Sequence, residues 1–269
     1  MQAEELLQQG ELDGALDALQ QAIRKEPSNA KLRVFLFQLL CINGAWERAL
    51  KQLDVAADLD PLNLPMAQTY REAIRCELFR KEVFSGDRSP LIFGDPPEWS
   101  AFLIEALRLS GTGEHTQAEA LRGQAFELAP ASAGAIDEQP FAWIADADTR
   151  LGPMLEAIVN GRYYWIPMQR LKQINVDAPE DLRDMVWAPA HLTFENEGEV
   201  VALIPTRYPG TENEADSALK LSRKTDWREP SKGVYTGLGQ RMLATERDEY
   251  PLLSTRQIQF QSATNDAAE

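Results

Sequence analysis

The sequence predicts an α+β fold: an array of paired helices, then a small, mainly β domain that forms a partly closed barrel and contains one helix. Two observations predict it. A helix-forming block that ends in proline occurs three times in the first half, and four of the six tryptophans and five of the six tyrosines lie in the second. The expected boundaries are 1–130 for the array, 131–139 for a linker, 140–261 for the β domain and 262–269 for a frayed tail.

The repeated blocks span residues 10–27, 44–61 and 113–130. Each begins with a glycine that turns the chain between two helices, carries alanines that let helices approach closely, and ends with a proline that stops the second helix. The blocks resemble tetratricopeptide repeats, whose stacked helix pairs form a curved array with a peptide-binding inner surface.

The blocks also depart from the repeat pattern at two positions. Arg122 stands where a large apolar residue is expected, and Phe37 stands where a small one is expected. The expected helices are 3–9 paired with 12–25, 30–42 paired with 46–59, a long segment at 66–84, and 99–109 paired with 115–128.

The inner surface of this array is the first candidate for partner binding. Arg71 and Arg75 are four residues apart and share one helix face, where they suit a carboxylate of a partner. They can instead pair with Glu72, with Glu77 or with solvent, and the array can serve only to hold its neighbour domain in place. The candidates from helical register are Val34, Gln38, Cys41, Arg71 and Arg75.

In the second half one helix is expected at 150–159, with Pro153 in its first turn and Gly161 as its stop. Short segments bounded by turn residues predict strands in the remainder. These strands are expected at 163–168, 186–194, 199–208, near 219–227, at 240–245 and at 256–260.

Three consecutive aromatic residues, Tyr163, Tyr164 and Trp165, lie on the first of these strands. Successive side chains on a strand point to opposite faces, so at least one of the three must face outward. We expect two in the core and the third in a surface contact, which makes the group a further candidate for partner binding.

Signals of catalysis are few. The sequence has no P-loop, G-x-S-x-G or H-E-x-x-H motif, and His115 and His191 are its two histidines. Cys41 and Cys76 fall in apolar helical stretches and are expected to be reduced core residues. The sequence therefore predicts no catalytic, cofactor or metal site.

The most suggestive polar cluster is Asp146, Asp148 and Arg150. An EF-hand loop that starts at Asp146 needs glycine at its sixth position and glutamate at its twelfth, where Leu151 and Ala157 stand. The favoured interpretation places the aspartates near the positive end of the expected helix, with Arg150 neutralising one of them. The alternatives are a hydrolase site built on this cluster and a glycosidase-like pair of carboxylates.

The composition narrows the range of partners. With 27 basic against 42 acidic residues the net charge is −15, which repels nucleic acid and acidic membranes. The longest nearly unbroken apolar stretch, 34–42, is half the length of a membrane span, and the first residues do not resemble a secretory signal. A cytoplasmic location without membrane insertion is expected.

Several blocks of the second half are specific enough to indicate a family. They resemble the ImpE/SciE family, also called TagJ, of accessory proteins of the bacterial type VI secretion system. The blocks are WIADADTRLGPMLEAIVNGRYYWIP, LRDMVWAPAHL, IPTRYPG, LSRKTDW and GLGQRMLAT.

The resemblance implies a non-enzymatic adaptor that binds the N-terminal helix of the small sheath subunit, TssB, and is linked to the AAA+ ATPase ClpV. We hypothesise that the apolar face of this partner helix lies in a groove, either on the inner surface of the array or between the two halves. The negative charge favours lysine or arginine on the rim of the helix. A structural repeat protein of another assembly is the alternative.

Overall fold

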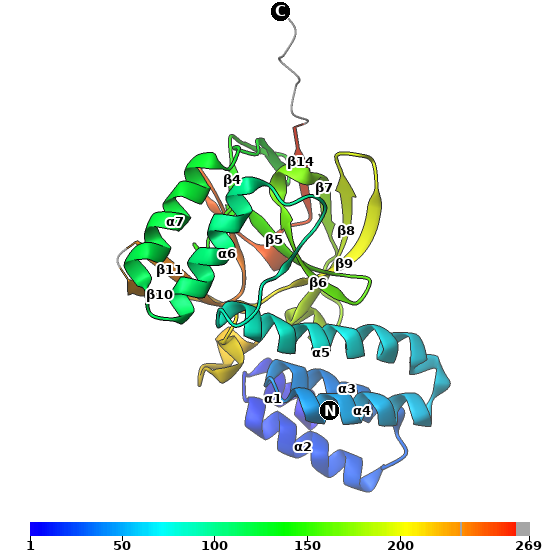
Figure 1. Ribbon diagram of the computed structural model, residues 1–269. Helices are drawn as coiled ribbons and strands as arrows, with labels where there is room; N and C mark the ends of the chain where they lie inside the picture. Colours follow the sequence, from blue (N-terminus) through cyan, green and yellow to red (C-terminus); the bar gives the residue numbers. More distant parts are fainter. Residues whose placement is uncertain (232, 262–269) are drawn as a thin grey trace, which may run out of the picture.

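The computed structural model describes residues 1–231 and 233–261 (Figure 1). Its N-terminal region is tetratricopeptide-like and helical. The glycines that open the repeated blocks, Gly10, Gly44 and Gly113, have φ of 82°, 65° and 83°, a left-handed conformation that other residues rarely adopt. They separate the helices of each pair, which are α1 (Gln2–Gln8) and α2 (Leu12–Lys25), α3 (Ala30–Ile42) and α4 (Trp46–Leu59), and α6 (Glu98–Gly111) and α7 (His115–Leu128), with η1 (Pro61–Asn63) and α5 (Leu64–Phe84) between the second and third pairs.

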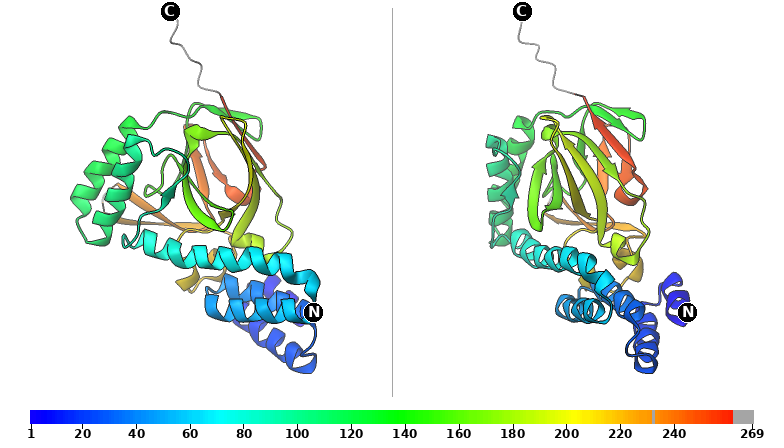
Figure 2. Two further views of the ribbon diagram at one scale, coloured as in Figure 1. Left: turned by 45° about the vertical axis from the view of Figure 1, so that its right-hand side comes forward. Right: turned by 90° about the vertical axis from the view of Figure 1, so that its right-hand side faces the viewer.

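The third helix pair does not continue the array. Helices α1 to α5 lie together below the β domain, whereas α6 and α7 stand on its flank at an angle to α5 (Figures 1 and 2). The cause is the intervening segment, in which β1 (Leu91–Ile92) pairs in parallel with a strand of the large sheet and leads the chain away from α5. The prediction that all three helix pairs stack into one array is therefore wrong for the third pair, α6 and α7.

The C-terminal domain is mainly β. One sheet has nine strands, and its two edge strands do not pair with each other, so the sheet curls without closing into a barrel (Figure 2). In spatial order its strands are β1, β6 (Arg162–Pro167), β5 (Met154–Val159), β9 (Glu199–Pro205), β8 (Trp187–Phe194), β7 (Leu171–Val176), β14 (Gln257–Phe260), β2 (Gly134–Ile136) and β3 (Gln139–Phe141).

Two smaller sheets complete the domain. The first has the order β13 (Glu249–Pro251), β12 (Met242–Thr245) and β4 (Ile144–Asp146), and the second is the hairpin of β10 (Thr225–Ser231) and β11 (Val234–Gly239). The remaining elements are short helices: α8 (Ser217–Lys220), η2 (Met168–Arg170), η3 (Leu182–Met185), η4 (Thr211–Asn213) and η5 (Leu252–Ser254).

The helix expected at 150–159 is the clearest error. Residues 154–159 of that segment form strand β5, and among the described residues of the domain the one α-helix is the short α8. Asn160 and Gly161, with φ of 49° and 72°, make a two-residue hairpin turn into β6, so Gly161 is a hairpin glycine rather than a helix stop. All six residues of β5 are buried, so the strand lacks the alternation of polar and apolar residues that identifies a strand in a sequence.

Other differences are smaller. The strands expected at 163–168, 186–194 and 199–208 are present as β6, β8 and β9, whereas β7 and β11 were not expected. The segment 131–139, expected to be a linker, contains β2, which pairs with β14 in the large sheet. The tail expected at 262–269 lies outside the described residues.

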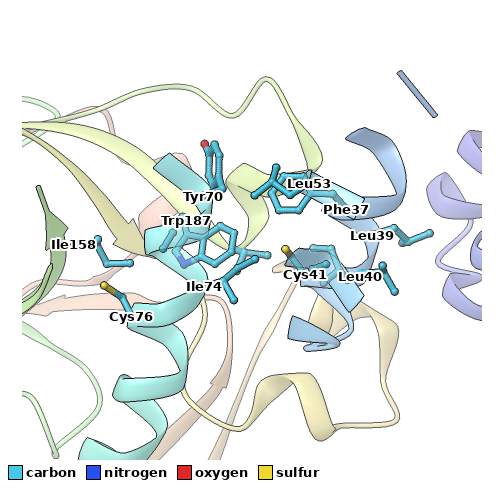
Figure 3. Packing of buried hydrophobic residues seen from close by; sticks show 14 of the residues in the cluster. Phe37, Leu39, Leu40, Cys41, Leu53, Tyr70, Ile74, Cys76, Ile158 and Trp187 are labelled. Atoms are coloured by element: carbon cyan, nitrogen blue, oxygen red, sulfur yellow. The ribbon is translucent and has the colours of Figure 1, made fainter. Parts of the chain in front are cut away.

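One hydrophobic core joins the array to the β domain. Its central side chain is Trp187 of β8, which is fully buried. The ring centroid lies 5.6 Å from that of Tyr70 on α5 and 6.0 Å from that of Trp46 on α4, and the indole nitrogen donates to Glu77 at 3.0 Å. In Figure 3 Trp187 lies beside Ile74 of α5, with α3 on one side and β5 on the other. A second core lies on the other face of the sheet, inside its curl.

We predict that Trp187→Ala lowers the free energy of unfolding by about 3–5 kcal/mol, because it opens a cavity in the core shared by both halves. The two halves should still unfold in one transition, measured by urea denaturation with circular dichroism. The control Tyr235→Ala removes an aromatic ring that is 47% exposed and should change stability by about 0.5 kcal/mol at most. Separate transitions of the two halves in the unmodified protein would contradict a shared core.

Candidate functional site

The α3 side of the inner face of the array is covered by the chain itself. Helix α3 packs against η3 of the β domain. Of the candidates on this helix, Gln38 is 6% exposed, Cys41 is fully buried and Val34 is half-buried. The expectation that Gln38 and Cys41 form a partner-binding surface is therefore corrected, because the β domain already occupies the space in front of them.

Two arginines of the β domain bind the C-terminal ends of array helices and so hold the two parts together. The Arg207 guanidinium donates to the carbonyls of Ile42 at 2.7 Å and Cys41 at 3.2 Å, in the last turn of α3. Arg223 makes the same kind of contact with α1, donating at 3.1 Å to each of two carbonyls in its last turn. A cation at the C-terminus of a helix satisfies free carbonyls and complements the negative end of the helix dipole.

The two arginine candidates of α5 lie at the surface and are paired. Arg71 forms an ion pair with Asp54 of α4 at 2.6 Å. Arg75 forms an ion pair with Glu72 at 2.6 Å, which is one of the alternative pairings named in the sequence analysis. Exposed pairs of this kind exchange readily with solvent or with a partner. Both arginines stay candidates for contact with a protein.

The three consecutive aromatic residues are arranged as expected, with two in the core. Tyr163 and Trp165 are 2% and 0% exposed, which corrects their candidacy for partner contact. Tyr164 is half-buried on the opposite face of β6, where its ring lies 5.3 Å from that of Phe93. Of the three, Tyr164 can reach a partner.

A buried network of charges lies between α5 and the sheet. Glu156 of β5 accepts from Nε of Arg80 at 2.6 Å and from its Nη2 at 2.9 Å, and also from Tyr163 and Arg241. Arg241 extends the network to Asp146. All four charged residues are at most 4% exposed. Each oxygen of Glu156 thus has two donors, so its negative charge is matched on both sides.

The network shifts the pKa values of its carboxyl groups. Burial alone would raise the pKa of Glu156, but Arg80 and Arg241 more than reverse this effect and lower it to about 2. Burial raises the pKa of Asp146 to about 6, and Arg241 offsets only part of that effect. Glu156 is therefore held as an anion by its arginine partners.

The cluster expected from the sequence is divided between this network and a second pair. Arg150 donates to Asp148 through Nε at 2.9 Å and through Nη2 at 2.5 Å, so it neutralises one aspartate as expected, although no helix follows. The Asp148 carboxylate also accepts from backbone N–H groups, including that of Gly237 at 2.9 Å. Asp146 instead belongs to the network of Glu156. These side chains hold loops and strands together.

The arginines that complete the network were missed in the sequence. Arg80 lies in ELFRKEVF, where charged and apolar residues alternate in short runs, and Arg241 lies in GLGQRM. Nothing local marks either arginine as buried, although a buried guanidinium needs a carboxylate partner. The partner itself could not be identified, because Glu156 is 76 residues from Arg80 and 85 from Arg241.

An open apolar cleft lies between the C-terminal end of α7 and β4. It has a volume of about 420 Å³ and is walled by Phe126, Trp143 and the small residues 129–132. Phe126 and Trp143 are each 39% exposed, and the Phe126 ring packs so closely on Gly152 that a side chain there would clash with it. Because β4 is an edge strand, this cleft is open to a partner along one side.

The described residues include no group of three or more His, Cys, Asp or Glu side chains placed to hold a metal ion. Cys41 and Cys76 are free and buried, as expected. Over 1–231 and 233–261, no helix has the length and apolar character needed to cross a membrane.

We predict that Glu156→Gln lowers the free energy of unfolding at pH 7 by about 3–5 kcal/mol, because it removes the carboxylate that two buried arginines share. Among the described residues, Arg241 then keeps only the carboxylate of Asp146, and Arg80 keeps only that of Glu77, at 3.4 Å. The pKa of Glu156 is lower in the folded state than in the unfolded chain. Its contribution is therefore complete above about pH 4.5 and is lost as the pH falls toward about 2.

The measurement is urea denaturation of both proteins from pH 7 to pH 3. The difference between them should shrink as the pH falls below about 4.5. Glu105→Gln, which removes an exposed partner of Arg108, is the matched control and should follow the unmodified protein. A difference that stays constant with pH would contradict a buried, ionised Glu156.

Known proteins resemble this chain over nearly its whole length. A family model described as ImpE protein matches residues 138–259, and one described as Tetratricopeptide repeat matches residues 6–74. The crystal structure of protein VPA1032 from Vibrio parahaemolyticus superposes with a TM-score of 0.88 at 27% identity, covering 97% of this chain and 98% of that one. The type VI secretion system accessory component TagJ of Pseudomonas aeruginosa is 53% identical, over 97% of this chain and 92% of that protein. The resemblance expected from the sequence is thereby confirmed, and the chain belongs to the ImpE family.

Proposed function

We propose that this protein is a non-enzymatic, cytoplasmic adaptor of a type VI secretion system. It binds the N-terminal amphipathic helix of the small sheath subunit, TssB, in the apolar cleft between α7 and β4, and it connects the sheath with the ClpV ATPase. The observation that carries the proposal is the pair Phe126 and Trp143, two half-exposed aromatic residues facing an open cleft. The Pseudomonas aeruginosa relative is a type VI secretion system accessory component, which supports the same assignment.

The form of the cleft suits a helix. An amphipathic helix presents apolar side chains at intervals of three and four residues along one face, and one or two of them can enter a cleft of about 420 Å³. Large aromatic residues at the centre of an interface supply most of the binding free energy when they become buried. Phe126 of α7 and Trp143, which directly precedes β4, both line the cleft.

The charge around the cleft favours a basic partner. Glu246 accepts from the backbone N–H groups of Ala142 at 2.9 Å and Trp143 at 3.4 Å, so a carboxylate lies beside the backbone of this segment. Glu127 follows Phe126 directly on α7 and is exposed. A helix with lysine or arginine at the edges of its apolar face would pair with both, within a protein of net charge −15.

An adaptor role agrees with the state of the buried carboxylates. Asp146, Asp148 and Glu156 are engaged by arginines of the same chain, and each is at most 4% exposed. A hydrolase would need a carboxyl group that can reach substrate. This arrangement supports binding rather than catalysis.

We predict that Phe126→Ala and Trp143→Ala each weaken binding of a TssB N-terminal peptide by about tenfold or more, because each removes a central aromatic contact. Fluorescence anisotropy with a labelled peptide measures the dissociation constant. Val201→Ala changes an apolar residue on β9 that is 64% exposed and outside the cleft, and it should leave the affinity unchanged. Full affinity in both cleft variants would place the partner elsewhere.

We also predict that association with this peptide slows with salt. The opposite charges of protein and peptide accelerate their encounter, so the association rate constant should fall about tenfold between low ionic strength and 0.5 M NaCl. Stopped-flow fluorescence measures the rate. A peptide whose rim lysines and arginines are replaced by glutamine is the control and should associate slowly at both salt concentrations. A salt-independent rate for the native peptide would contradict the proposed charge complementarity.

A further inference from the structure

Arg122 of α7 is a buried cation without a counterion among the described residues. It is 4% exposed, and within residues 1–231 and 233–261 its Nε and Nη1 have no hydrogen-bond partner. Its Nη2 has one long contact, to Ser110 Oγ at 3.5 Å. This residue is also one of the two departures from the repeat pattern, since a large apolar side chain is expected at its position.

The surrounding carboxylates do not neutralise it. Asp148 lies near, but both of its oxygens are held by Arg150 and by backbone N–H groups. Burial lowers the pKa of Arg122, and the attraction of Asp148 and Glu119 does not offset that effect. A buried guanidinium with unused donors costs several kcal/mol unless an acceptor fills the place beside it.

A cleft of about 770 Å³ lies beside this side chain. It separates α6 and α7 from the β10–β11 hairpin and also borders the C-terminal end of α5. Arg122, Arg150, Arg228 and His115 line it, although the protein as a whole is strongly acidic. Arg150 is paired with Asp148 and Arg228 with Glu214 at 2.8 Å, so Arg122 is the lining arginine without a carboxylate pair among the described residues. Glu229 is the one carboxylate among the described lining residues, and it accepts from the N–H of Gly233 at 2.9 Å.

We propose that this cleft binds a small organic molecule through an oxyanionic group, a phosphate or a carboxylate, with Arg122 as its buried counterion. The two free donors of Arg122 would meet two oxygens of the anion, as guanidinium groups commonly do. Arg228 and His115, nearer the surface, would contact the outer part of the molecule. The volume exceeds that of a single phosphate ion, so the anionic group belongs to a larger ligand.

The site is separate from the apolar cleft, which has none of these residues in its walls. The two clefts lie on the same helix, α7, with Arg122 and Phe126 one turn apart. Anion binding can therefore be tested without the sheath peptide.

The test is thermal unfolding of the full chain in inorganic phosphate, pyrophosphate or citrate, each compared with NaCl at equal ionic strength. The unmodified protein should gain about 2–4 °C in Tm with at least one of these anions. Arg122→Leu should be at least as stable in NaCl, because it restores the apolar residue of the repeat, and it should show no gain with the anion. Arg88→Gln, which removes an exposed arginine outside the cleft, should keep the full gain.

Isothermal titration with the same anions gives an independent measurement. Arg122→Lys keeps the charge but loses the paired donors, so it should bind about tenfold more weakly. A response to phosphate or pyrophosphate alone assigns a phosphate group, and a response to citrate alone assigns a carboxylate. The proposal is overturned if the unmodified protein responds to none of the three anions, or if Arg122→Leu responds as strongly as the unmodified protein does.

Discussion

The arrangement of the two parts depends on one buried carboxylate. Glu156 lies in the middle of a strand with no exposed residue, and its charge is tolerated only because Arg80 and Arg241 supply donors to both of its oxygens. Arg80 belongs to α5, so neutralising Glu156 requires this helix to lie against the sheet. With α5 fixed there, Trp187 fits between α4 and α5, and η3 meets the inner side of α3. Removing one partner would leave an unpaired charge in the core, which costs more than the pair itself contributes.

This arrangement changes what the repeats are for. In a free-standing array the inner surface is the place where a peptide binds. Here the β domain covers the α3 side of that surface, and Arg207 and Arg223 attach it to the ends of α3 and α1. Arg71 and Arg75 of α5 stay exposed. The α3 side of the array thus supports the β domain, and the two clefts described above lie around α7, which is not part of the stacked array. The short parallel pairing of β1 with β6 makes this possible, because it carries α6 and α7 to the flank of the sheet.

The sequence predicted those features that depend on local chemistry. Glycine and proline mark the helix ends in the repeats, so the bounds of α2, α3 and α4 agree with expectation to within one residue. Strand β5 was missed because it is buried on both faces, although Asn160–Gly161 is a strong signal for a hairpin. The ion network and both clefts could not be predicted, because they bring together residues that are distant in sequence. Phe126 and Trp143, for example, lie on different elements, and nothing local indicates that they face one cleft.

The covered inner face of the array also bears on how the protein is made. The helices that carry this face leave the ribosome first, whereas η3, Arg207 and Arg223 emerge only when most of the chain has been synthesised. During that interval the apolar side of α3 has no cover from its own chain and is exposed to water and to chaperones. The apolar side of α3 therefore stays uncovered until late in translation. A chain that ends before Arg223 would lack part of this cover and would expose apolar surface that favours aggregation.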